Sequence, residues 1–350
     1  MKGGATLLGN LHPNLAKEIS PMRTLLVLVL LLTVASFATP SHAQFTYAAV
    51  NVPGAVSTQA RGINSGGEVV GFYKTAACAD SNIQVPNCPT KGFKLVNGSY
   101  IKLMVPGSVS TAIMGVNDLG DLVGFYSKMQ TGCSLPVSHG FIWYHTNVVK
   151  TIDAPGTPVC PAAEPGGSGG PITVAMGINK AGTVVGGVWA TGQGGAFPDQ
   201  GFVWVNGTFS TMDPENAPTT NPCCWSVNGI ANSGAITGEV FQADFFMAWF
   251  KQAADEDFYQ FSGGDTVGTG VDSNTDVAGY GTSTGGFFAK HIELNEGTND
   301  ATEVHPGFIP VQFPGAGATM PFGMNELHWL AGAYNDSTGV TRGFMAKPNF

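Results

Sequence analysis

One acidic segment of the chain begins like a calcium-binding loop. Asp272, Asn274 and Asp276 place oxygen ligands at alternate positions, as such a loop does at its start. The pattern then fails, because Val277 stands where the loop needs glycine and Ser283 where it needs a bidentate glutamate. We therefore predict a turn here and no dedicated metal site, while an ion shared between distant loops stays an open alternative.

A second segment satisfies a hydrolase motif by its letters. Residues 166–170 read G-x-S-x-G, the pattern in which Ser168 would be a nucleophile. That motif acts at a sharp turn between a strand and a helix, whereas this copy lies between Pro165 and Pro171 in a glycine-rich insertion. Ser168 is interpreted as a linker residue, and neither a catalytic residue nor a cofactor is predicted.

The histidines and remaining carboxylates form no local motif. The histidines beyond residue 43 lie in separate parts of the chain, without H-E-x-x-H spacing. They are His139, His145, His291, His305 and His328. We predict surface or hydrogen-bonded structural histidines, with a metal triad assembled across repeats as the alternative. Carboxylate pairs such as Asp118 with Asp121 are common in turns and are assigned no role.

Trp225 is the residue that we single out for ligand binding. It follows the vicinal Cys223 and Cys224 in an insertion rich in proline and asparagine. An exposed indole there would stack on a sugar or on a partner surface.

The cysteines predict disulfide bonds. All six lie after residue 43, and an even number is typical of chains that enter an oxidising compartment. Fifteen pairings are possible, of which Cys78 with Cys88 would close a single loop and is the possible disulfide that we name. Metal binding by these thiols is disfavoured because no pair of C-x-x-C motifs is present.

A ten-residue repeat indicates the elements that must position these residues. Six segments begin and end in glycine. Between the glycines, each has an apolar residue, a turn that contains Asn or Asp, and apolar residues that begin the next strand. These frames are GINSGGEVVG from Gly62, GVNDLGDLVG from Gly115, GINKAGTVVG from Gly177, GIANSGAITG from Gly229, GVDSNTDVAG from Gly270 and GMNELHWLAG from Gly323. Each frame predicts a β-hairpin. The fourth and fifth hairpins are expected to be the least regular, because Ala231 and Asp272 replace the turn asparagine.

The flanking segments raise the count to four strands per repeat. A strand that ends in a proline-glycine turn precedes most frames, and a strand that opens with Gly-Phe follows after a loop. The sequence therefore predicts an all-β, six-bladed β-propeller of four-stranded antiparallel blades. The last repeat lacks its final strand, and the segment from Phe45 to Asn51 is expected to supply it and close the ring. A β-solenoid or a sandwich repeat is the alternative.

Residues 1–43 are predicted to be a signal peptide ahead of a single propeller domain at residues 44–350. Basic residues precede the apolar run from Leu25 to Phe37, and Ser41-His42-Ala43 resembles a cleavage site before Gln44. Translation from Met22 would give a leader of ordinary length. A membrane anchor is the alternative, but the run is shorter than the roughly 20 residues that a spanning helix needs. The predicted location is secreted, either extracellular or periplasmic.

Charge and composition restrict the partners. The net charge is −9, and removal of residues 1–43 makes it more negative, which excludes nucleic acid as a favoured partner. Charged residues make up only 11% of the chain, against 49 glycines and 22 prolines, which suits short strands joined by tight turns. After cleavage no stable membrane span is expected, and we predict a monomer.

The repeats also resemble a known family. The pattern G-[IV]-N-x-x-G-x-[VL]-V-G-x-Y, with VPGA-like turns and Gly-Phe strands around it, looks like that of the bacterial extracellular repeat proteins called the HAF family. The resemblance extends over residues 45–350 and is most degenerate in the fifth repeat. It implies a secreted bacterial repeat protein and supplies no catalytic residues.

Two hypotheses for function follow. The first is a non-enzymatic binding or interaction scaffold, whose insertions at residues 74–91, 127–138, 157–174 and 190–199 share one place in their repeats and contact an unknown protein or glycan from one rim. The second is a glycan-directed hydrolase or lyase with its site at the central channel. Carboxylates or histidines from at least three repeats that meet at the channel mouth with shifted pKa values would favour the enzyme, and an apolar plug would favour the scaffold.

Overall fold

The computed structural model describes residues 44–75, 89–133, 136–155, 172–189, 200–212, 223–242, 245–253, 259–261, 265–282, 285–290 and 308–350. The chain divides into two units, Met1–Ala43 and Gln44–Phe350. All of the structure that follows belongs to the second unit. Within the described ranges, no helix is long and apolar enough to cross a bilayer.

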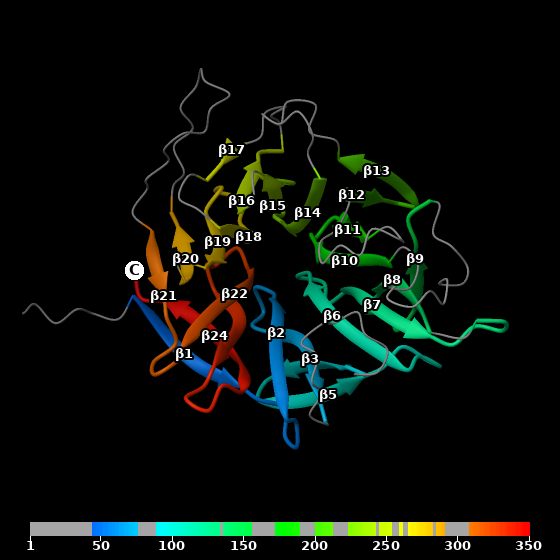
Figure 1. Ribbon diagram of the computed structural model, residues 1–350, viewed down its shortest axis with the longest axis horizontal. Coiled ribbons are helices and arrows are strands. Elements are labelled where there is room, and N and C mark those ends of the chain that lie inside the picture. The colour runs from blue at the N-terminus through cyan, green and yellow to red at the C-terminus, as the bar shows by residue number, and fades with distance from the viewer. Residues whose placement is uncertain are drawn as a thin grey trace, which may run out of the picture. The chain divides into compact units, whose positions relative to one another are not determined.

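The second unit contains six four-stranded antiparallel sheets, which Figure 1 shows as blades around a common axis. Blade 1 contains β2 (Ser57–Ile63), β3 (Val69–Lys74), β4 (Lys91–Val96) and β5 (Ser99–Leu103). Blade 2 contains β6 (Ser110–Val116), β7 (Leu122–Lys128), β8 (Val137–Trp143) and β9 (Val149–Ile152). Blade 3 contains β10 (Ile172–Ile178), β11 (Val184–Trp189), β12 (Gln200–Val205) and β13 (Thr208–Met212).

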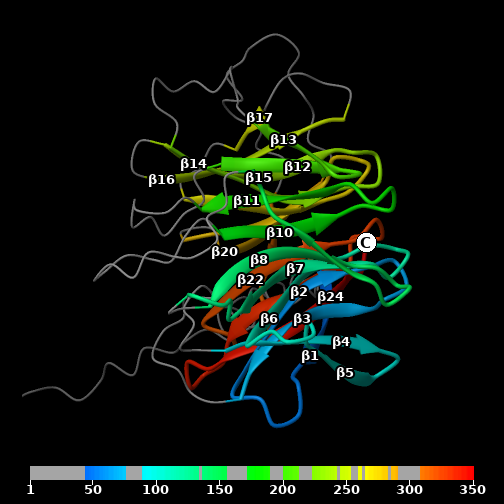
Figure 2. The ribbon, with the colours of Figure 1, turned by 90° about the vertical axis from the view of Figure 1, so that its right-hand side faces the viewer.

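The other three blades repeat the same order. Blade 4 contains β14 (Cys223–Ile230), β15 (Ile236–Gln242), β16 (Phe245–Lys251) and β17 (Tyr259–Gln260). Blade 5 contains β18 (Thr266–Val271), β19 (Val277–Gly281), β20 (Gly285–Ala289) and β21 (Ile309–Val311). Blade 6 contains β22 (Ala318–Met324), β23 (Leu330–Asn335), β24 (Thr341–Pro348) and β1 (Phe45–Val50). The side view in Figure 2 shows β10, β11 and β12 side by side within one blade. The predicted six-bladed propeller is confirmed.

The N-terminal strand closes the ring, as the sequence predicted. Strand β1 pairs antiparallel with β24, in a register that runs from Phe45 opposite Pro348 to Val50 opposite Gly343. The backbone N–H of Asn349 donates to Gln44 O beyond the last pair. Blade 6 thus contains both ends of the repeat array. Pairing with β1 covers the edge of β24, which could otherwise pair with a strand of another chain.

The Gly-Phe strands form the core between the blades. Their phenylalanines are at most 1% exposed in five repeats, namely Phe93, Phe141, Phe202, Phe287 and Phe344. Burial of each such side chain contributes about 1.5–3 kcal/mol, so that the repeated dipeptide is a large part of the driving force for folding. The repeated Gly-Phe dipeptide therefore reflects the need to pack neighbouring blades against each other.

The six frames form six equivalent hairpin turns between the first and second strands of the blades. In each turn the N–H of the third frame residue, such as Asn64, donates to the carbonyl of the residue four positions later, here Glu68. The N–H three positions later, here that of Gly67, donates to the carbonyl of the third frame residue. The expectation that the turns at Ala231 and Asp272 are irregular is wrong. The pattern is made by the backbone, so loss of the asparagine does not remove it, and in the fifth turn Asp272 Oδ1 accepts from the N–H of Asp276 just as an asparagine would.

The first strands of the blades, β2, β6, β10, β14, β18 and β22, each contact the first strands of both neighbours and surround the axis. Each carries a β-bulge immediately before the frame glycine. The glycine is required by the close approach of these strands, since a Cβ at Gly115 would lie 2.7 Å from Met176 O in the next blade. A bulge redirects a side chain, here toward the axis.

Candidate functional site: the axial channel

Strand direction defines the two ends of the propeller. The frame turns lie at one end, which we call the turn face, and we call the opposite end the loop face. The β3–β4, β7–β8 and β11–β12 connections leave from the loop face because antiparallel strands alternate in direction. The insertion at 157–174 joins β9 to β10 instead of following a second strand, and its last three residues belong to β10, which corrects the sequence interpretation. That connection also leaves from the loop face.

The predicted binding residue Trp225 does not lie on an exposed insertion. It belongs to β14, is 4% exposed and packs on Trp249 with 5.8 Å between ring centroids. The expectation of an exposed indole is wrong because β14 begins at Cys223, two residues earlier than the insertion was thought to end. Trp225 is thus a core residue of blade 4.

The named disulfide lies outside the described residues. Both Cys78 and Cys88 fall in the range 76–88, of which the structure describes nothing. Cys133, between β7 and β8, is disulfide-bonded.

Each described histidine contacts an aspartate. His139 Nδ1 lies 2.8 Å from Asp153 Oδ2, and His145 Nδ1 lies 2.7 Å from Asp121 Oδ1. His328 Nε2 contacts two carboxylates, and this cluster joins blades 5 and 6. These contacts agree with the interpretation of the histidines as structural.

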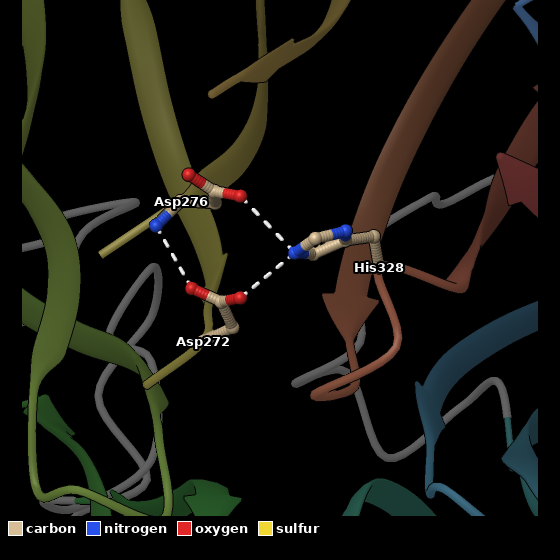
Figure 3. Close-up of side chains that lie close together, drawn as sticks. All are labelled: Asp272, Asp276 and His328. Atoms are coloured by element: carbon tan, nitrogen blue, oxygen red, sulfur yellow. Dashed lines mark hydrogen bonds and ion pairs between the residues drawn. The ribbon is translucent and has the colours of Figure 1, made fainter. Parts of the chain in front are cut away.

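Figure 3 shows the cluster of His328 with Asp272 and Asp276, which no local pattern indicated. Nε2 lies 2.9 Å from Asp272 Oδ2 and 3.0 Å from Asp276 Oδ2, and both carboxylates are at most 1% exposed. Their hydrogen bonds, that of Asp272 first, raise the pKa of His328 to about 9. The three ligand atoms lie within 4.8 Å of one another, as a metal site would need. As it stands, the cluster is an ion pair in which the partly exposed imidazolium of His328 contacts two buried carboxylates.

Hydrogen bonds between the turn asparagines of neighbouring blades explain why an ion pair occurs at the junction of blades 5 and 6. The side-chain amide of the turn asparagine donates to the carbonyl of the equivalent residue in the next blade, from Asn64 to Asn117 at 3.1 Å and from Asn325 to Asn64 at 2.8 Å. The carboxylate of Asp272 cannot donate such a bond. Instead, His328 donates from blade 6 back to Asp272. His328 has a φ of 59° and stands at the turn position that glycine occupies in blades 1–4.

The turn face of the channel is closed by two carboxylates. Asp118 Oδ1 accepts from the backbone N–H of Ser65 at 2.8 Å, and Asp118 Oδ2 accepts from the Asn232 amide at 3.2 Å. Glu326 accepts from the backbone N–H groups of Asn232 and Ser273, both at 2.8 Å. These residues come from five different blades, so the bonds bridge the mouth of the channel.

A wider groove of about 530 Å³ lies on the turn face between blades 1 and 2. Its lining includes Lys94, Trp143 and His145. The cation of Lys94 lies 2.9 Å from Glu68, and His145 is held by Asp121. The charged groups of this groove are therefore satisfied by the protein itself.

The residue before the frame lines the channel in every repeat, and the residue after the frame does so in blades 4 and 5. The bulge residues that precede the frames are Arg61, Met114, Met176, Asn228, Thr269 and Phe322. The residues that follow the frames are Phe72, Phe125, Gly187, Glu239, Tyr280 and Ala333. A cavity of about 120 Å³ touches the whole first set and, from the second, Glu239 and Tyr280. Polar side chains from blades 1, 4 and 5 thus meet apolar ones from blades 2, 3 and 6.

Arg61 is the cation of this cavity. Its guanidinium lies over the Phe322 ring, 3.8 Å from the centroid, and donates from Nη2 to Gln59 Oε1 at 2.7 Å. Nε is buried, and among the described residues none accepts its hydrogen bond and no carboxylate pairs with the guanidinium. Burial lowers the pKa of Arg61 to about 10, so that it stays charged at neutral pH.

Glu239 and Tyr280 face Arg61 across the cavity. Burial raises the pKa of Glu239 to about 7, against the opposing hydrogen bond from Ser226. The Ser226 hydroxyl lies 3.1 Å from Glu239 Oε1 and 2.9 Å from Asn228 Oδ1, and its single proton serves one acceptor at a time. Burial, with the nearby Glu239, raises the pKa of Tyr280 to about 12. At neutral pH the cavity therefore holds a fixed cation and a neutral phenol, together with a carboxyl group whose pKa burial has raised from 4.5 to about 7.

Arg61, Glu239 and Tyr280 were not predicted from the sequence. A signal was present in the repeat itself, because Arg61 is the only charged residue among the six that precede the frames, and the position after the frame, where Glu239 and Tyr280 stand, is Phe, Gly or Ala in the other four repeats. Comparing equivalent positions of the repeats would have identified them. The channel is neither the apolar plug nor the set of converging carboxylates that the two hypotheses required.

The arrangement of sheets defines the class of the protein, which is a six-bladed β-propeller. Among solved structures, the chain is similar to the β-propeller domain of the Trilobed protease from Pyrococcus furiosus, described as having an open velcro topology, with a TM-score of 0.39 and 7% sequence identity over 83% of this chain and 97% of that chain. It is also similar to native Bacillus subtilis arabinanase, with a TM-score of 0.29 and 9% identity over 79% of this chain and 88% of the other. No protein-family model and no curated protein matches the sequence.

Proposed function

We propose that the protein is a secreted, non-enzymatic binding protein whose ligand site is the axial channel. The observation that carries the proposal is the cavity of about 120 Å³, whose lining combines the polar side chains of Arg61, Asn228, Glu239 and Tyr280 with methionine and phenylalanine. A concave site with a few converging polar groups and perturbed pKa values is the usual form of a small-molecule site. The predicted signal peptide at residues 1–43 and the resemblance to extracellular repeat proteins support secretion.

Hydrolysis of glycans is less well supported by the channel. Most glycosidases need two carboxyl groups on opposite sides of the bond, about 5–9.5 Å apart. Among the described residues that line the cavity, Glu239 is the only carboxylate. The cavity is also too small for a polysaccharide chain, which favours a ligand of a few heavy atoms.

A lyase is the second candidate, and one observation favours it. A carboxyl group with a pKa of about 7 is suited to proton abstraction at neutral pH, and it lies beside a phenol and opposite a cation. Elimination next to a carboxylate would use Arg61 to neutralise the acid, Glu239 to take the α-proton and Tyr280 to protonate the leaving group. Such a reaction creates a C=C bond that absorbs in the ultraviolet.

Ligand-observed NMR with purified protein tests the binding function. The library would hold sugars, organic acids, amides and phosphates, and each mixture would be followed for turnover as well as binding. The matched variant is Met176→Phe, which fills the cavity with the side chain that Phe322 already places at the equivalent bulge. Ligands that bind unchanged and lose affinity in Met176→Phe support the proposal. Turnover of a bound compound would support the lyase, and binding insensitive to Met176→Phe would move the site away from the channel.

A further inference from the structure

Building on the proposed binding function, we propose that the channel cavity takes a small organic carboxylate, held by the guanidinium of Arg61. The cation is the first reason. Burial of an unpaired charge is costly, and proteins pair such charges or neutralise them. Arg61 is charged at neutral pH and, among the described residues, donates a side-chain hydrogen bond only to the neutral Gln59, while its Nε has no acceptor. An anion in the cavity completes this arrangement.

The planar guanidinium group of Arg61 favours a carboxylate as the ligand. A guanidinium donates two parallel hydrogen bonds to a carboxylate, and Nε is one of the donors that such a pair can use. Stacking on Phe322 fixes the plane of the guanidinium before any ligand arrives. The side chain is thus preorganised for a flat anion, with little conformational entropy to lose on binding.

The apolar part of the lining determines the rest of the ligand. Met114 of blade 2 and Met176 of blade 3 provide an apolar surface that an inorganic anion could not use. The volume of about 120 Å³ corresponds to on the order of eight water-sized groups at about 15 Å³ each. The occupant is therefore a short-chain acid, with its carboxylate toward blade 1 and its carbon chain toward blades 2 and 3.

The protonation of Glu239 sets the pH range of binding. The titratable groups that face the cavity are Arg61 on β2, Glu239 on β15 and Tyr280 on β19, and the other lining residues do not ionise. Below pH 7 the carboxyl group of Glu239 is neutral and can donate a hydrogen bond to the bound carboxylate. Above pH 7 it is ionised and repels the ligand, so binding weakens as the pH rises.

Calorimetric titration of the full protein with three probes tests the class of ligand. The probes are propionate, its neutral analogue propionamide and inorganic phosphate, each at pH 6. We expect propionate to bind at least about 10-fold more tightly than propionamide and than phosphate. In Arg61→Met, which introduces the residue of blades 2 and 3, propionate affinity should fall roughly 10- to 100-fold. The control is Arg342→Met, which removes an arginine that pairs with Asp336 on blade 6, outside the channel.

A second measurement does not depend on the folding of an Arg61 variant. Propionate affinity of the unmodified protein should fall between pH 6 and pH 8, and in Glu239→Gln it should stay level over the same range. Equal affinity for propionamide, preference for phosphate, unchanged affinity in a folded Arg61→Met, or a pH response retained in Glu239→Gln would each overturn the carboxylate assignment. If the wider library still yields ligands sensitive to Met176→Phe, the binding function stands without it, and if it yields none, both proposals fail.

Discussion

The turn face and the channel interior both carry charged side chains close to the axis, but they differ in the partners that the protein supplies. At the turn face Asp118 and Glu326 accept hydrogen bonds from backbone and side-chain groups of other blades. Inside the channel Arg61 has one neutral acceptor and no paired carboxylate among the described residues. The first arrangement stabilises the ring, whereas the second is completed only by something that the chain does not contain.

The blade 5–6 junction is a third charged region, and it resembles the turn face in being satisfied. Two buried aspartates would be costly alone, and the imidazolium of His328 pairs with both. The contrast teaches that burial of charge is not by itself a sign of function in this fold. The informative feature is a buried charge without its counter-charge.

Removing His328 should have the largest effect. His328→Ala removes the cation that the buried Asp272 and Asp276 share, and we expect the free energy of unfolding to fall by about 3–5 kcal/mol. Chemical denaturation measures this change. His145→Ala is the control, because that imidazole side chain is 54% exposed and its loss should cost less than about 1 kcal/mol. Equal losses in the two variants would contradict the ion-pair interpretation.

Arg61→Met should act in the opposite direction on stability. Replacing this unpaired, half-buried charge by an apolar side chain of similar length is expected to raise the free energy of unfolding by about 1 kcal/mol in the absence of ligand. Denaturation without added anions measures the gain. A loss of stability of similar size would mean that Arg61 is part of the framework, like the turn-face carboxylates.

Glu326→Ala should cost about 1 kcal/mol. The variant leaves the N–H groups of Asn232 and Ser273 without their acceptor, but both lie at an exposed mouth where water replaces the carboxylate. Denaturation compared with Glu326→Gln, which keeps one acceptor oxygen, checks the value. A change above about 3 kcal/mol would show that the closure of the mouth is essential to the ring.

The pH dependence of stability should separate Glu239 from His328. Both groups have pKa values raised by folding, so the native state binds more protons than the unfolded state between the two pKa values of each group, and stability falls as the pH rises. For Glu239 the loss extends from about 4.5 to about 7, and for His328 from about 6.5 to about 9. Thermal denaturation measured across this pH range tests the assignment. In Glu239→Gln the melting temperature should no longer fall between about pH 4.5 and 7, and in His328→Ala it should no longer fall between about pH 6.5 and 9.

The repeat alone was sufficient to predict the blades. The frames at Gly62 and its five siblings specify hairpins through local turn chemistry, and the Gly-Phe strands specify the core. The missing last strand of the final repeat, together with the segment after Phe45, even indicated how the ring closes, because a strand that lacks a partner in one place must find it in another. The hairpins depend on residues close together in the sequence, and the ring closure could be predicted because one end of the repeat array lacks the strand that the other end supplies.

Tertiary structure decided which side chains meet. Trp225 is buried because β14 starts at Cys223, and His328 reaches Asp272 because blades 5 and 6 are neighbours. Arg61 and Glu239 lie in different blades, and only closure of the ring places them at one cavity. Hairpins are determined by local hydrogen bonds, whereas the content of the channel depends on the bulges and on the packing of all six blades, which no short segment encodes.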